Sequence, residues 1–209
     1  MGCGGSDGTG TVGPADGGAE TGPGPGPAIP DPDGGPEGGG PTADAGDGGT
    51  RDDRIDPIEV GRSWTYNVQV LGIYPLCTNG VHTSAVLQKA GLDGKTAFDV
   101  QSFCPSVGVV KYAVEGDRVF VHFGGAWVLS LDAPVAENHT WTDGLLNYKW
   151  EKKGTVTVTA GTFSDCWQAT TVASYTSYIQ LCRGVGPVKW HYEDGFGNGY
   201  EAILVSKNF

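Results

Sequence analysis

The stretch Trp64-Thr65-Tyr66-Asn67-Val68-Gln69-Val70 decides the fold class, because large apolar and polar side chains alternate along it. Successive side chains of a β-strand point to opposite faces, so a period of two predicts a strand with one buried face. Further runs rich in β-branched or aromatic residues follow at positions 81–89, 96–103, 109–115, 118–123, 127–131, 146–152, 155–159, 166–172, 178–182, 188–193 and 200–206.

Turn signals separate these runs at short intervals, as in Asp93-Gly94, Gly116-Asp117 and Lys153-Gly154. No segment shows a sustained helical period with caps. We therefore predict an all-β domain, a strongly curved antiparallel meander sheet or partly open barrel.

The acidity and the glycine content belong to the N-terminal part of the chain. Of 209 residues with a net charge of −11, residues 1–60 contain 12 acidic and 2 basic side chains, and residues 1–50 contain 19 of the 36 glycines. Such a segment buries too little apolar area to offset its ordering entropy. We predict a disordered acidic Gly/Pro-rich tether at residues 1–55 and the all-β domain at residues 56–209. The domain is nearly neutral, which argues against a nucleic-acid partner.

The segment Met1-Gly2-Cys3-Gly4-Gly5-Ser6 offers a lipidation site, and two chemistries fit it. One is N-myristoylation with a palmitate on Cys3, which would place the protein on a cytoplasmic membrane face. The other is the lipid-accepting cysteine at the end of a bacterial lipoprotein signal. We favour the second, because the other four cysteines form an even set that suits two disulfides in an oxidising compartment. This predicts an extracytoplasmic protein anchored to a bacterial membrane.

The hairpin formed by residues 166–172 and 178–182 predicts one of these disulfides. A register centred on residues 173–175 places Cys166 directly opposite Cys182, close enough to form a bond. Cys77 and Cys104 remain as the second pair, which no register demands.

Several motifs resemble a known family. They are Gly61-Arg62-Ser63-Trp64-Thr65-Tyr66, residues 112–121, Trp141-Thr142, residues 158–163 with Cys166, Gly184-Val185-Gly186-Pro187-Val188, and Gly199-Tyr200 with Leu204. The pattern is similar to an uncharacterised domain of bacterial envelope lipoproteins, and its shape resembles the curved half-barrels of the LolA/LolB type. The resemblance implies a bent antiparallel sheet that can enclose an apolar cleft, and it implies no reaction. Pro187 departs from the usual pattern, in which an aliphatic residue stands there.

Signals for catalysis are sparse. Nucleophile and zinc motifs such as G-x-S-x-G and H-E-x-x-H do not occur, and the four histidines lack paired ligand spacing. The domain's carboxylates fall mostly in turns, where they cap backbone N–H groups. We predict no catalytic residues, no metal, no cofactor and no enzymatic activity. A hydrolase of cell-wall or polysaccharide substrates, with two carboxylates brought together by the fold, is the less favoured alternative.

The aromatic residues of the domain can have one of two structural roles. They can fill the core, or they can line a concave face that receives an apolar ligand or a partner's side chain. The candidates for such a cleft are Trp64, Tyr66, Trp127, Trp150 and Trp190, with Trp141 and Trp167 as further tryptophans. The predicted function is thus a lipid-anchored, non-enzymatic envelope lipoprotein that binds a partner protein or an apolar ligand. The alternative is a structural spacer with a filled interior.

Overall fold

The computed structural model of the chain describes residues 52–173 and 175–209. Cys3 and most of the predicted tether lie outside the described residues, so the lipidation site stays a prediction. None of the described helical segments is long and apolar enough to span a membrane.

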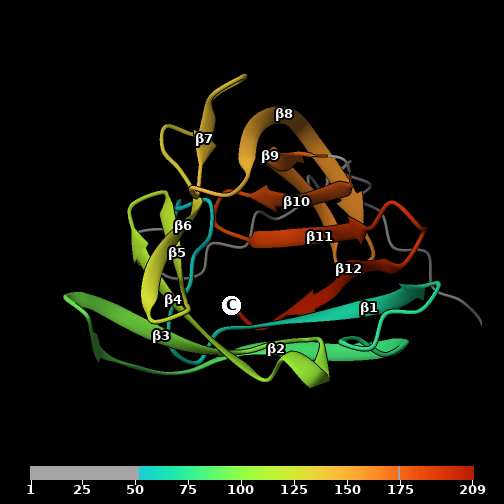
Figure 1. The fold of residues 1–209 in the computed structure, drawn as a ribbon, viewed down its shortest axis with the longest axis horizontal. Coiled ribbons are helices and arrows are strands. Elements are labelled where there is room, and N and C mark those ends of the chain that lie inside the picture. Colours follow the sequence, from blue (N-terminus) through green and yellow to red (C-terminus); the bar gives the residue numbers. More distant parts are fainter. Residues whose placement is uncertain (1–51, 174) are drawn as a thin grey trace, which may run out of the picture. The chain divides into compact units, whose positions relative to one another are not determined.

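The described residues form one antiparallel sheet of twelve strands (Figure 1). The strands are β1 (Ser63–Leu71), β2 (Gly80–Leu92), β3 (Lys95–Gln101), β4 (Val109–Glu115), β5 (Arg118–Phe123), β6 (Ala126–Leu131), β7 (Thr140–Thr142), β8 (Asn147–Val158), β9 (Gly161–Val172), β10 (Thr176–Cys182), β11 (Gly186–Glu193) and β12 (Gly199–Lys207). Within residues 52–173 and 175–209, one 3-10 turn, η1 (Pro105–Val107), lies between β3 and β4. The predicted all-β meander is confirmed.

The first and last strands pair in the middle of the sheet, which gives the fold its shape. The order β6-β5-β4-β3-β2-β1-β12-β11-β10-β9-β8-β7 makes two meandering arms that curl toward each other. The free edges β6 and β7 are consecutive in the chain, and Trp141 Nε1 of β7 donates to the Ser130 carbonyl of β6 over 3.3 Å. Trp150 Nε1 donates to the Asp132 carbonyl just beyond β6 over 2.8 Å. Indole N–H groups therefore link the two edges of a nearly closed barrel.

The alternation in β1 is confirmed, because Trp64, Tyr66 and Val68 are buried on the inner face. The two predicted strands at 146–152 and 155–159 are wrong as separate elements, since they form the single strand β8. Gly154 takes a positive φ of 70° inside an irregular stretch of the β8–β9 pairing, so this glycine makes a bulge and not a turn. The sequence did not predict the short strand β7, because its three residues are too few to show an alternating pattern.

Both predicted disulfides are present. Cys182 is the register partner of Cys166 in the β9–β10 hairpin, with 4.0 Å between their Cα atoms. Cys77 and Cys104 are joined with a Cα separation of 4.3 Å, which fastens the β1–β2 connection to the β3–β4 connection. The second bond fixes two loops that no strand pairing would hold together.

The chain enters the sheet by crossing one end of it. Ile55 and Pro57 are fully buried there. Ile55 N donates a hydrogen bond to Asp117 Oδ1 over 3.0 Å. Gly184 N donates a hydrogen bond to the Arg54 carbonyl over 3.0 Å. Asp117 lies in the β4–β5 turn and Gly184 in the β10–β11 turn, so residues 52–58 tie the two arms together. We call this side the closed end. The packed unit thus includes residues that precede the predicted boundary at 55/56.

Alternate connections of an antiparallel meander lie at the same end of its strands. The β1–β2, β3–β4 and β11–β12 connections therefore lie opposite the closed end, and we call this side the mouth. Ile73 N donates to Asn198 Oδ1 over 2.9 Å, and Ser106 N donates to the Leu76 carbonyl over 3.3 Å. These contacts join three of the mouth connections to one another.

Candidate functional site

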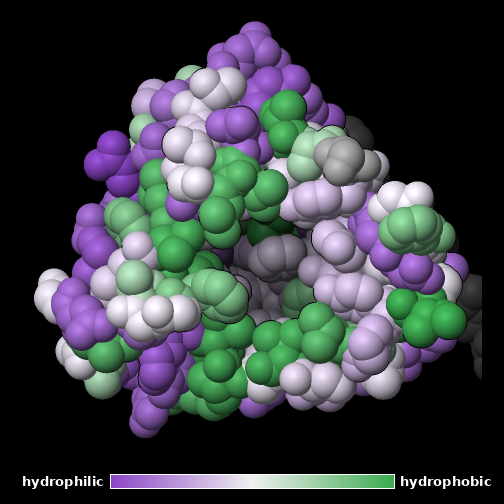
Figure 2. Space-filling model, in the orientation of Figure 1, coloured by the Kyte–Doolittle hydropathy of each residue, from purple (hydrophilic) through white to green (hydrophobic). Residues whose placement is uncertain are grey.

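The inner face of the sheet encloses a cavity in three adjoining compartments. Two have volumes of about 190 and 210 Å³, and a third of about 40 Å³ adjoins the first. Trp190 lines all three compartments, while Tyr74 and Tyr200 line both of the larger ones. Figure 2 shows a hollow at the centre of one face of the molecule, bordered by hydrophobic and weakly polar side chains.

Strand alternation places most of the aromatic lining. In β11 Trp190 and Tyr192 both border the cavity, and in β12 Tyr200 points inward together with buried Ala202. The register sets Trp190 between Ile179 of β10 and Ala202 of β12. The small Ala202 side chain leaves room for the indole, because facing neighbours of unequal size interdigitate.

The rings of Tyr74, Phe103, Trp190, Tyr192 and Tyr200 form one cluster. Ring centroids are 5.5 Å apart for Tyr74 and Tyr192, 5.4 Å for Tyr74 and Tyr200, and 5.7 Å for Phe103 and Trp190. Such separations suit tilted and edge-to-face ring contacts. Because Tyr74 and Phe103 belong to the two loops joined by the Cys77–Cys104 disulfide, that bond holds part of the cavity wall.

The mouth carries exposed apolar side chains, which we call the rim: Ile73, Leu76, Val107 and Phe196. Ile73 is 84% exposed and Phe196 is 91% exposed. The β1–β2 and β3–β4 connections contain no charged residue. In the β11–β12 connection, Asp194 Oδ1 accepts hydrogen bonds from the Phe196 and Asn198 amides, so this charge is satisfied within its own loop. The rim is therefore apolar and nearly uncharged.

The smallest compartment lies toward the closed end and contains Asp56. This residue is 7% exposed, its Oδ1 has no hydrogen-bond partner, and burial raises the pKa of its carboxyl to about 7. Burial also raises the pKa of Tyr112 to about 12 and that of Tyr66 well above its usual range. Tyr66 donates its hydroxyl to the Pro187 carbonyl over 3.0 Å. The compartment is dry enough to disfavour charge on its own side chains.

The structure brings three of the five predicted cleft aromatics together. Trp64, Tyr66 and Trp190 line the Asp56 compartment. Trp150 is completely buried in ring packing with Trp141 at 5.2 Å, and Trp127 packs on His122 and donates Nε1 to the Leu92 carbonyl. These last two indoles stabilise the edges of the sheet and do not line the cavity.

Sequence reasoning missed Tyr74, Phe103, Tyr112, Tyr200 and Asp56. The alternation of Tyr200, Ala202 and Leu204 would have identified Tyr200 as inward-facing. Tyr74 and Phe103 lie in connections, and Asp56 lies in the entering segment, so no period marks them. Their place in the wall follows from the second disulfide and from the crossing of the closed end.

The described residues contain no group of three or more His, Cys, Asp or Glu side chains that could hold a metal ion. Asp56 is the one carboxylate among the residues lining the three compartments, and His191 is the one histidine. His191 stacks on Tyr178 with 4.9 Å between ring centroids. No pair of carboxylates faces these compartments within the described chain.

Comparisons with known proteins identify no family. No family model and no curated protein matches the sequence. Two solved structures show similarity, each over 75% of this chain. One is a "putative lipoprotein" from Parabacteroides distasonis, with 13% identity, a TM-score of 0.42 and 99% of its chain covered. The other is a "putative exported protein with YmcC-like fold" from Bacteroides fragilis, with 10% identity, a TM-score of 0.43 and 100% of its chain covered. The resemblance to LolA/LolB carriers stays a prediction.

Proposed function

We propose that this protein is a non-enzymatic, extracytoplasmic binding protein that is anchored to a bacterial membrane through Cys3 and holds an elongated apolar ligand, such as a lipid acyl chain. The observation that carries the proposal is the aromatic cavity, which runs from the mouth to the closed end of one curved sheet. Ligand sites are typically concave, mostly apolar and supplied with few polar groups. The cavity has this composition.

The size of the compartments supports a slender ligand. An apolar cavity of about 150 Å³ already accommodates a ring such as benzene, and the two larger compartments measure about 190 and 210 Å³. They meet at Tyr74, Trp190 and Tyr200. A flexible chain can occupy both compartments, whereas a bulky rigid ligand would have to displace these rings.

The alternatives are less well supported by the geometry. A spacer domain was expected to have a filled interior, and the interior of this sheet holds cavities. A hydrolase of the predicted kind needs two carboxyl groups about 5–10 Å apart in a cleft, and Asp56 has no second carboxylate beside it in the compartment wall. Binding therefore accounts for more of the described residues than either alternative.

The two disulfides support the proposed compartment, because such bonds persist in oxidising surroundings. The predicted tether suits such an anchor, because a random coil of the 48 residues between Cys3 and Asp52 would have an r.m.s. reach of roughly 35–42 Å. The apolar rim supports exchange of the ligand at a membrane, since exposed Ile and Phe side chains suit the boundary between head groups and acyl chains.

The test uses the full chain with Cys3→Ser, so that no lipid anchor interferes. Val110 lines the cavity, and its neighbour Val109 is 48% exposed and does not. Wild-type tryptophan emission should shift on titration with alkyl-chain ligands. Val110→Phe should fill the first compartment and weaken binding by about tenfold or more, because it removes contact with several methylene groups.

Val109→Phe is the matched control and should leave affinity unchanged. Absence of binding by the wild-type chain, or equal affinity of both variants, would contradict the proposed site.

A further inference from the structure

Asp56 lies in the wall of the smallest compartment with no partner for its carboxyl. Asp56 is 7% exposed, and its buried Oδ1 accepts no hydrogen bond from the described chain. Buried carboxylates are normally paired or hydrogen-bonded, because an isolated charge in an apolar setting is costly. An unpaired carboxyl at the end of a ligand cavity therefore indicates that a group of the ligand is its partner.

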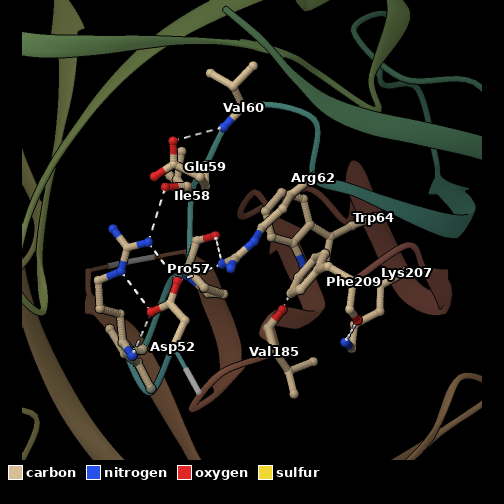
Figure 3. Close-up of polar contacts among 12 residues, drawn as sticks. Asp52, Pro57, Ile58, Glu59, Val60, Arg62, Trp64, Val185, Lys207 and Phe209 are labelled. Carbon is tan, nitrogen blue, oxygen red and sulfur yellow. Dashed lines mark hydrogen bonds and ion pairs between the residues drawn. The ribbon is translucent and has the colours of Figure 1, made fainter. Parts of the chain in front are cut away.

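The guanidinium groups of the entering segment are already paired with Asp52 and with backbone carbonyls; Figure 3 labels Asp52, Pro57 and Arg62 of this network. Asp52 accepts from Arg54 Nε over 2.9 Å, from Arg54 Nη2 over 2.7 Å and from Arg62 Nη1 over 2.6 Å. Arg62 Nη1 also donates to the Pro57 carbonyl over 2.7 Å. Both guanidinium groups are thus committed to Asp52 and to the backbone, and neither contacts the Asp56 carboxyl.

The remaining wall around Asp56 is largely aromatic, and Ile58, Ser84, Val100 and Pro187 complete it. Trp64, Tyr66, Phe103, Tyr112 and Trp190 all line this compartment. The faces of aromatic rings are negative and attract ammonium groups, most strongly where water is excluded. A carboxylate among several aromatic rings is a setting that favours a cation over an anion.

The volume limits the size of the cation. The compartment measures about 40 Å³, whereas a single water needs at least about 10–15 Å³. A head group of one or two heavy atoms fits, and a trimethylammonium group is too large. The adjoining compartment of about 190 Å³ shares Ser84, Val100, Phe103, Tyr112 and Trp190 with this one, so a chain attached to the head can continue into it.

We propose that the closed end of the cavity binds the primary ammonium head of an amphipathic amine, with Asp56 as the counter-ion and the alkyl chain in the larger compartments. The inference rests on the proposed function for the binding of the ligand's alkyl chain. It adds the chemical identity of the ligand's head group. It makes Asp56 the residue that determines which apolar ligands are preferred.

The experiment compares octylamine, octanol and octanoate as ligands of the full chain carrying Cys3→Ser. The three share one chain and differ in the charge of the head. Octylamine should bind about ten- to hundredfold more tightly than octanol, as expected for a charge-assisted hydrogen bond. Octanoate should bind most weakly, because a second carboxylate would face Asp56.

Asp56→Asn should reduce octylamine affinity to that of octanol and leave octanol affinity unchanged. The variant removes an unpaired buried carboxyl, so folding should be retained, and thermal unfolding checks this. Glu59→Gln is the matched control, since Glu59 belongs to the same segment but its side chain is only half-buried and is paired with Lys89 over 3.1 Å. It should keep the amine preference.

Equal binding of octylamine and octanol by the wild-type chain would overturn the head-group assignment while leaving the proposed function intact. An amine preference that survives Asp56→Asn would overturn it as well. Failure of all three ligands to bind would contradict the proposed function itself.

Discussion

At the residue scale, two aspartates of the entering segment have opposite electrostatic situations. The hydrogen bonds of Arg54, with those of Arg62, hold the pKa of Asp52 well below its usual range. Burial raises the pKa of Asp56 from 3.8 to about 7. The first carboxyl favours folding when it is ionised, and the second favours folding when it is protonated. The same short segment therefore holds a structural ion pair and a carboxyl that is available to a ligand.

The pKa of Asp56 leads to a prediction about stability and pH. In the unfolded chain the carboxyl releases its proton near pH 3.8, and in the folded chain near pH 7. Between these values the folded state binds the extra proton, so its contribution to stability is complete at low pH and is lost as the pH rises through about 7. The loss is on the order of 4 kcal/mol.

Urea unfolding of the wild type and of Asp56→Asn measures this effect. As the pH rises from about 4 to about 7, the wild type should lose stability relative to Asp56→Asn. Above about pH 7 the difference in unfolding free energy should be constant. Asp52 titrates below this window and does not contribute to the difference. Parallel pH profiles of the two proteins would show that the carboxyl is solvated and would contradict its burial.

At the element scale, the two disulfides hold different parts of the same sheet. Cys166–Cys182 joins two strands that are already paired, whereas Cys77–Cys104 joins two mouth connections that carry Tyr74 and Phe103. The first bond therefore adds stability to a hairpin. The second also positions part of the cavity wall.

Two double variants separate these roles. The hairpin variant, Cys166→Ser with Cys182→Ser, removes a bond between residues that are 16 apart in sequence. The mouth variant, Cys77→Ser with Cys104→Ser, removes a bond between residues that are 27 apart. Each should lose about 3–4 kcal/mol of unfolding free energy in the chain-entropy account. Only the mouth variant should also weaken ligand binding, as measured by tryptophan emission under conditions where both variants are folded. Equal affinities would mean that the mouth loops do not shape the cavity.

At the scale of the whole molecule, the two ends of the sheet differ in chemistry. The closed end is held by ion pairs, such as Arg183 with Asp117 at 2.9 Å and Arg62 with Asp52 at 2.6 Å. The mouth presents the uncharged apolar rim. The cavity therefore opens on the side that suits a membrane or another apolar surface, and the chain enters the domain on the polar side.

This asymmetry predicts how the unlipidated chain binds vesicles. With Cys3→Ser, the protein should co-sediment with phosphatidylcholine vesicles through the rim, and added salt should have little effect because the rim connections contain no Lys or Arg. Ile73→Ser with Phe196→Ser should weaken binding by about tenfold or more. Val60→Ser with Leu87→Ser removes exposed apolar side chains away from the mouth and serves as control. Binding that depends on salt, or equally on both pairs, would contradict a role of the rim.

The sequence alone determined the fold class, most strand positions and the Cys166–Cys182 pair, because alternation and hairpin register are local properties of the chain. It also identified Trp64, Tyr66 and Trp190 as residues that can line a cleft. It did not separate them from Trp150, because burial in a core and exposure to a cavity produce the same apolar pattern along a strand.

Only the tertiary structure decided how the two arms curl, which end is closed and what the cavity contains. These features depend on contacts between distant segments, such as Ile55 with the Asp117 turn and the Cys77–Cys104 bond. A loop residue such as Tyr74 has no alternating pattern that would show which way its side chain points. The Asp56 carboxyl is buried without a cationic partner because Arg54 and Arg62 both bind Asp52. The site is set by long-range packing, whereas the sheet is set by local pattern.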